Sequence, residues 1–150
     1  MLTVNHVPVG AAIGLISRNH PVAALGLGVL SHLALDAIPH WGITSPGHHS
    51  EFTRVAERDG LAGLALSALM LRAAPPTARP AVALGIIGAV APDFDHITTY
   101  FFNRTIWPQR FRKFHGVIQK GGSTPMKQEL MRAALSSLAV LCVLATRPRP

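Results

Sequence analysis

The sequence predicts an all-α protein with a single domain, and three observations lead to this prediction. Hydrophobic residues make up 49% of the 150 residues and charged residues only 14%, below the roughly 25% of an average soluble domain. The apolar residues gather in five segments of 10 to 18 residues, separated by proline, glycine and polar residues. No segment alternates apolar and polar residues as a half-buried strand does. The length suits one domain over residues 1–150.

Each apolar segment is expected to form a helix. The first contains Gly10 and Gly14, which have the spacing of small residues in close helix contacts. Pro21 suits the first position of the second helix, where Gly26 and Gly28 lower the helix propensity but permit tight packing. The helices are expected at residues 8–17, 21–38, 61–71, 80–91 and 129–145.

The connecting segments are polar or rich in turn residues. Residues 40–50 are expected to form a loop. Residues 51–59 are expected to form a short helix or the lead-in to the third long helix, and the aromatic-rich residues 97–107 a short helix. Residues 108–125 are basic, and the pattern predicts a loop there.

The third and fourth apolar segments lack a polar face, which favours a membrane protein. Such a helix must be buried in protein or in lipid, and a chain of this length cannot bury several of them. No segment has the roughly 18 to 20 uninterrupted apolar residues that a bilayer core requires, so a crossing helix would place polar ends at the interface. We expect a bundle of about five mostly antiparallel helices, embedded in a membrane or associated with one.

The chain carries a formal net charge of +7, from 14 basic and 7 acidic residues. Such a balance suits anionic lipid headgroups or nucleic acid. The basic residues are spread over several loops and form no recognisable nucleic-acid-binding module, so membrane lipid is the expected partner and nucleic acid is not. The single cysteine, Cys142, lies in an apolar segment, which leaves no disulfide framework and no thiol metal site.

The stretch from Ser31 to Trp41 carries the clearest chemical signal. His32 and Asp36 are four positions apart, so they lie one turn apart on one helix face. An imidazole and a carboxylate in this arrangement can bind a divalent ion such as zinc. Two other interpretations stay open: a hydrogen bond between the two side chains, or an ordinary helix end before Pro39.

An antiparallel trace brings most polar residues to one end of the bundle. His6 precedes the first helix, Asp36 ends the second, and the turn 92–96 ends the fourth on the same side, near His115. All 7 acidic residues and all but one of the 8 histidines fall at this end. The candidate metal ligands are His6, His32, Asp36, Asp93, Asp95, His96 and His115. Of the other histidines, His20 is taken as structural, and His48 and His49 are taken as surface residues.

Two groups at this end have further expected roles. Asp93, Asp95 and His96 can supply several ligands from one turn, although a solvated helix-end loop is the alternative. Asp95 is the expected general base if it does not bind the ion. Basic residues of segment 108–125 can neutralise the charge of a phosphate group, or they form a solvated juxtamembrane loop. The expected substrate-binding residues are Arg110, Arg112 and Lys113.

Four separated motifs cover most of the chain. They are His6-x-x-x-Gly10, Ser31-His32-x-x-x-Asp36-x-x-Pro39-His40-Trp41, Pro92-Asp93-x-Asp95-His96 and Phe114-His115-x-x-Ile118-Gln119. Together they resemble the LexA-binding, inner-membrane-associated hydrolases, which are small bacterial membrane proteins. The His-Arg-Gly-x-Thr-His-Ser stretch of the larger relatives is absent, and we take His115-Gly116 as its counterpart. A more distant similarity, to zinc-dependent phospholipase C, rests on the His-x-x-x-Asp spacing alone.

The resemblance implies a helical protein of the bacterial inner membrane with a metal-dependent hydrolase site. The implied site residues are His6, His32, Asp36, Asp93, Asp95 and His96. We therefore expect a divalent metal cofactor, zinc or a pair of ions, and a phosphoester substrate at or near the membrane. Two alternatives stay open. One is a non-catalytic membrane protein in which a metal or polar cluster ties the second and fourth helices together, and the other is a basic protein that binds lipid or nucleic acid through residues 104–120.

Overall fold

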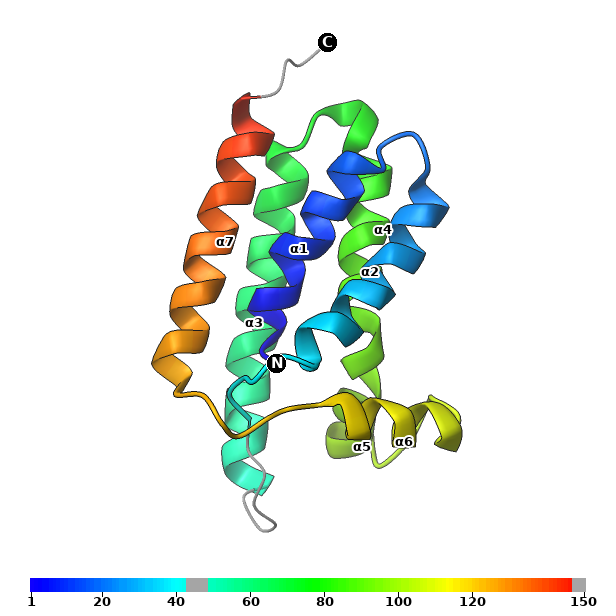
Figure 1. The fold of residues 1–150 in the computed structure, drawn as a ribbon, viewed down its shortest axis with the longest axis vertical. Helices are drawn as coiled ribbons and strands as arrows, with labels where there is room; N and C mark the ends of the chain where they lie inside the picture. The colour runs from blue at the N-terminus through cyan, green and yellow to red at the C-terminus, as the bar shows by residue number, and fades with distance from the viewer. Residues whose placement is uncertain (43–48, 147–150) are drawn as a thin grey trace.

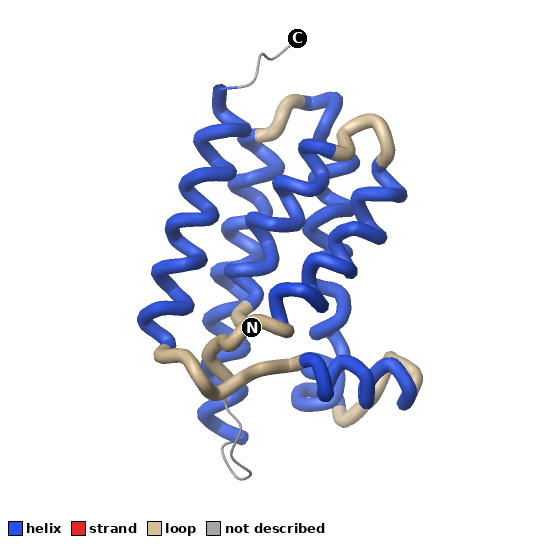
Figure 2. The backbone as a smooth tube through the Cα atoms, in the orientation of Figure 1, coloured by secondary structure: helices blue, strands red, loops and turns tan. Residues whose placement is uncertain are grey.

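The computed structural model describes residues 1–42 and 49–146, and within that part the chain forms helices and no strand (Figure 2). The α-helices are α1 (Thr3–Ile16), α2 (Pro21–Asp36), α3 (His49–Ala73), α4 (Arg79–Val90), α5 (Phe94–Phe102), α6 (Gln109–Ile118) and α7 (Met126–Thr146). Single turns of 3-10 helix, Pro76–Ala78 and Ala91–Asp93, adjoin α4 at its two ends. The predicted all-α class is confirmed.

Five long helices, α1, α2, α3, α4 and α7, run up and down beside one another, and α5 and α6 lie at one end of them (Figure 1). These five are the helices that the apolar segments predict. Residues 51–59 form the lead-in to α3, as one of the two expectations had it. The predicted loop over 40–50 lies largely outside the described residues, as do His48 and the side chain of His49.

The prediction of about five helices was incomplete, because residues 109–118 form α6 where a loop was expected. This helix has no long apolar segment to reveal it. It is held by tertiary contacts instead: His115 is buried against the bundle, and the side chain of Arg112 pairs with Asp95 on α5. A short helix of this kind depends on such contacts, because helices of ten residues are marginal in isolation.

Helix α4 lies at the centre of the bundle, where α1 and α2 pack closely on it. A Cβ atom added at Gly10 would lie 2.6 Å from the carbonyl oxygen of Gly85, and one added at Gly28 would lie 2.5 Å from the same atom. The close packing expected at these two positions is therefore confirmed. The expectation of close packing at Gly26 was wrong, because an added Cβ there would meet nothing within 4 Å.

The apolar core and the buried polar residues occupy different parts of the bundle. The core lies between α1, α3, α4 and α7 and includes Val7, Ala11, Met70, Val82 and Leu144. Buried polar side chains gather toward the end where α5 and α6 lie. They include Asn5, His6, His32, Asp36, Asp95, His115 and Glu129.

Two helical stretches of the described chain are long and apolar enough to cross a membrane. One is Pro76–Phe102, which runs through α4 and α5, and the other is Met126–Thr146, which is α7. Length and composition alone define them, and α1 and α2 are apolar but shorter. The structure therefore contains helices of the kind that the membrane prediction requires.

Candidate metal centre

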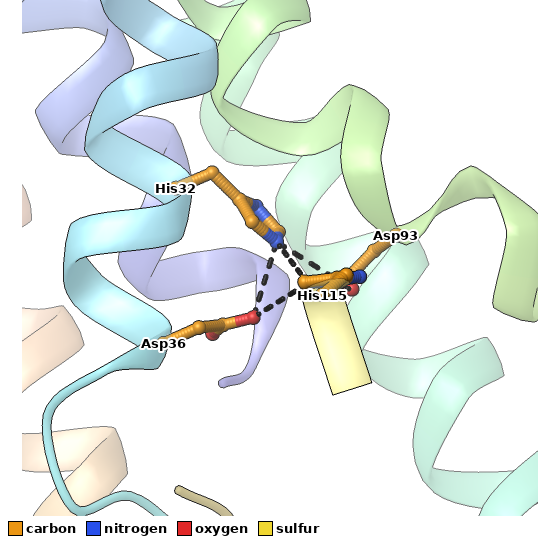
Figure 3. Close-up of side chains that lie close together, drawn as sticks. All are labelled: His32, Asp36, Asp93 and His115. Carbon is orange, nitrogen blue, oxygen red and sulfur yellow. Dashed lines mark hydrogen bonds and ion pairs between the residues drawn. The ribbon is translucent and has the colours of Figure 1, made fainter. Parts of the chain in front are cut away.

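Four side chains that could hold a metal ion converge at one end of the bundle: His32, Asp36, Asp93 and His115 (Figure 3). Each offers one ligand atom, and these four atoms lie within 4.8 Å of one another. His32, Asp36 and His115 are buried, and the side chain of Asp93 is 20% exposed. Two imidazoles and two carboxylates are a donor set that suits zinc and neighbouring divalent ions.

Three separate parts of the chain supply these residues. His32 and Asp36 lie one turn apart near the end of α2, Asp93 belongs to the turn after α4, and His115 lies on α6. The close contact of α2 with α4 orients His32, because its Nδ1–H donates a hydrogen bond of 2.7 Å to the carbonyl oxygen of Ala89. With Nδ1 engaged in this way, Nε2 is the nitrogen free to bind an ion, as in many metal centres.

The spacing of the ligand atoms fits a small ion. Oδ2 of Asp36 lies 3.1 Å from Nε2 of His32 and 3.0 Å from Nε2 of His115, and the two nitrogens are 3.1 Å apart. Oδ1 of Asp93 lies 3.6 Å from Nε2 of His32 and 3.8 Å from Nε2 of His115. Ligands at about 2 Å around a tetrahedral ion are about 3.3 Å apart, so all these separations are compatible with one shared ion.

The groups around Asp36 shift the pKa of its carboxylate. Burial acts to raise the pKa of Asp36, but the hydrogen bond from His115 and the close imidazoles of His32 and His6 outweigh it and hold that pKa well below its usual range. Asp36 is therefore an anionic ligand at neutral pH.

Two further predicted ligands lie beside the cluster. His6 on α1 stacks on His32 with ring centroids 4.1 Å apart, and its Nε2 lies 3.4 Å from Oδ1 of Asp36. His96 on α5 lies on the other side, with Nε2 3.8 Å from Oδ1 of Asp93 and a side chain that is 45% exposed. Each of these two histidines therefore lies next to a carboxylate of the ligand set, His6 next to Asp36 and His96 next to Asp93.

Asp95, expected as a ligand and general base, is not brought to the cluster. Its Oδ1 accepts hydrogen bonds from the backbone N–H groups of Ile106 and Trp107, at 2.7 and 3.1 Å, and its Oδ2 pairs with Nε of Arg112 at 2.7 Å. Asp95 thus connects α5, the following loop and α6.

The three basic residues expected to bind substrate lie on α6. Arg112 is engaged by Asp95, and Arg110 and Lys113 are exposed. None of the three lines the cavity beside the metal ligands.

That cavity, of about 420 Å³, opens beside Asp93 and His96. Apolar and aromatic side chains from three places line it, among them Trp41, Phe52 and Tyr100. Phe52 and Tyr100 stack with ring centroids 4.0 Å apart. Sequence reasoning missed these lining residues, because aromatic residues from α3, α5 and a loop meet only in the folded chain.

Two carboxylates that sequence reasoning also left without a role fix the start of α1. Asp59 on α3 accepts hydrogen bonds from the backbone N–H groups of Thr3 and Val4, at 2.6 and 3.2 Å. Glu129 on α7 accepts from the N–H of Leu2 at 3.2 Å and from Nδ2 of Asn5 at 3.1 Å. Burial raises the pKa of Asp59 despite the hydrogen bonds from Thr3 and Val4. These acids satisfy the free N–H groups of a helix start and so position His6.

Comparison with known proteins adds no relative to this picture. No family model, no curated protein and no solved structure matches the chain. Membership of the hydrolase family that the motifs resemble therefore stays a prediction.

Proposed function

We propose that this protein is a membrane-associated hydrolase whose divalent ion, zinc by its donor set, is held by His32, Asp36, Asp93 and His115. One observation carries the proposal: four ligand atoms from three parts of the fold lie within 4.8 Å of one another, directly beside a cavity of about 420 Å³. A structural zinc site is closed by its protein ligands, whereas a catalytic site keeps an open position. The exposed edge of Asp93 on the cavity favours the catalytic arrangement.

The ion would supply Lewis acidity, which activates water and polarises the bond to be broken. The residues of this chain have separate tasks. His115 and the Ala89-oriented His32 hold their nitrogens toward the ion, and the carboxylates of Asp36 and Asp93 offset its charge. His96 lines the cavity beside Asp93 and is half-exposed, so it is placed to give or take a proton.

The cavity supports a phosphodiester as the substrate class within the phosphoesters. Its lining includes two aspartates and two histidines, Asp59, Asp93, His40 and His96, but no lysine or arginine among the described residues. The amino group of Met1 also lies on the lining but is paired with Asp36. A group with one negative charge is compatible with that lining, whereas a doubly charged monoester lacks the side-chain cations that usually hold it. The aromatic walls suit an apolar or ring-bearing substituent on the ester.

The resemblance implies a location in the bacterial inner membrane. A belt around the bundle that is free of Lys, Arg, Asp and Glu supports a membrane location. Each helix of the bundle contributes a stretch without Lys, Arg, Asp or Glu: 2–17, 19–35, 60–71, 80–92 and 133–146. Large apolar side chains in this belt are exposed, including Val22, Leu30, Leu61, Leu64, Leu135 and Leu138. An apolar surface of this extent is typical of contact with lipid.

The protein should stay in the membrane fraction at pH 11, a treatment that removes peripheral proteins, whereas release into the supernatant would contradict the proposed embedding.

The hydrolase proposal is tested with the protein in mild detergent. Metal is removed with a chelator and restored with zinc or manganese, and hydrolysis of bis(p-nitrophenyl) phosphate, p-nitrophenyl phosphate and p-nitrophenyl acetate is measured. We expect turnover of the diester that depends on metal. It should be lost in Asp36→Asn, strongly reduced in His96→Gln with metal content unchanged, and unaffected in His20→Gln, which alters an exposed histidine at the other end of the bundle.

The outcomes separate the alternatives. Metal bound without turnover of any ester in the panel would contradict the hydrolase and favour a metal that only ties α2, α4 and α6 together. Failure to bind metal at all would remove the centre itself and leave His32 and Asp36 as a buried ion pair.

A further inference from the structure

The environment of His6 is not explained by a single ion on the four ligands. Its side chain is 1% exposed. Neither Nδ1 nor Nε2 has a hydrogen-bond partner, although the ring contacts His32 and Asp36. Stacking on His32 accounts for the ring faces but leaves both nitrogens unsatisfied. Buried polar atoms without a partner are uncommon and point to an absent ligand where they face a charged group.

The carboxylate of Asp36 faces two sets of nitrogens with its two oxygens. Oδ2 faces Nε2 of His32 and of His115, at 3.1 and 3.0 Å. Oδ1 faces Nε2 of His6 at 3.4 Å and the amino group of Met1 at 2.8 Å. A cationic nitrogen therefore lies against Oδ1, on the side of Asp36 away from the proposed first ion.

We propose that His6 and Oδ1 of Asp36 bind a second divalent transition-metal ion, so that Asp36 bridges two ions. The inference rests on the proposed function, because the first ion shares the same carboxylate. The separation of Oδ1 from Nε2 of His6, 3.4 Å, matches two ligands at about 2 Å from one ion. Ions on the two oxygens of one carboxylate lie about 3.5–4 Å apart, the spacing of two-metal sites that clamp both sides of a phosphoryl group.

The second ion has fewer protein ligands than the first. His6 and Asp36 supply two, and the amino group of Met1 would be displaced by the ion. Water would complete the coordination, as is usual for divalent ions held by few side chains. This difference predicts unequal affinities, with the His6 ion lost first on dilution into chelator.

The test measures how many metal ions bind to each protein molecule and whether two of them are adjacent. Metal-free protein in detergent is reconstituted with manganese, and bound metal is measured by elemental analysis. Electron paramagnetic resonance of the same samples distinguishes an isolated Mn²⁺ ion from an exchange-coupled pair. His6→Phe keeps a ring stacked on His32 but removes the nitrogens, and His6→Ala removes the ring as well. His40→Phe is the matched control, because His40 is also buried, at 2% exposure, but its Nδ1 bonds to the carbonyl oxygen of Ile38.

We expect two equivalents and a coupled spectrum in the wild type and in His40→Phe, and one equivalent with an isolated-ion spectrum in both His6 variants. One equivalent in the wild type, unchanged by His6→Phe, would overturn the second ion and leave the proposed function intact. No bound metal in the wild type would overturn both. If neither His6 variant folds, the wild-type spectrum decides alone, since only a coupled pair supports the bridge.

Discussion

Replacing Gly28 by alanine tests how the packing of α2 on α4 controls the metal centre. An added Cβ would lie 2.5 Å from the carbonyl oxygen of Gly85 and 2.9 Å from the backbone nitrogen of Ala89. To restore an ordinary contact of 3.4 Å to that oxygen, α2 has to move away by about 0.9 Å. The 2.7 Å hydrogen bond from His32 to Ala89 would then stretch beyond the usual limit for such bonds.

The expected change in the free energy of unfolding of Gly28→Ala is the sum of opposing contributions. Alanine favours a helix over glycine by about 1 kcal/mol, whereas overpacking against rigid backbone costs about 1–3 kcal/mol and the lost hydrogen bond about 1 kcal/mol. We expect a net destabilisation of about 1–3 kcal/mol. Metal affinity should fall about 10- to 100-fold, as is usual when the partner that orients a ligand is removed.

The assay is chelator competition for zinc, together with thermal unfolding in detergent. Gly26→Ala is the matched control, because an added Cβ there meets nothing within 4 Å. It should bind zinc as the wild type does and be equally or slightly more stable. Wild-type zinc affinity in a folded Gly28→Ala protein would refute the link between helix packing and the orientation of His32.

A further prediction concerns the connection between α5 and α6. Asp95→Asn should loosen α6 and weaken zinc binding less than His115→Ala does, because Asp95 acts through the positions of Ile106, Trp107 and Arg112. An equal loss in both variants would instead make Asp95 a ligand.

The sequence was sufficient to predict the helices that carry their own apolar pattern. All five long helices were expected, because each contains an apolar stretch bounded by proline or polar residues. The pair His32 and Asp36 could be identified because a helical spacing of four places both on one face. The turn at Asp93 joins them because an antiparallel trace returns α4 to the same end.

The remaining features depend on contacts between distant parts of the chain. Helix α6 has a basic, mixed sequence and is held by Arg112 with Asp95 and by burial of His115. The motif around Asp93 offers two carboxylates of equal chemical type, and only the fold turns Asp93 toward the histidines and Asp95 toward the backbone of 106–107. The roles of Asp59 and Glu129 at the start of α1 likewise have no local signal.

The most direct test of the central claim is to locate the metal. Crystals grown with zinc and measured on both sides of the zinc absorption edge give an anomalous difference map that shows each ion without reference to activity. The account predicts a peak about 2 Å from Nε2 of His32, Nε2 of His115 and the carboxylates of Asp36 and Asp93. That peak should be absent from Asp36→Asn crystals. No peak within the four side chains in crystals saturated with zinc, or peaks held only by residues outside this set, would contradict the account.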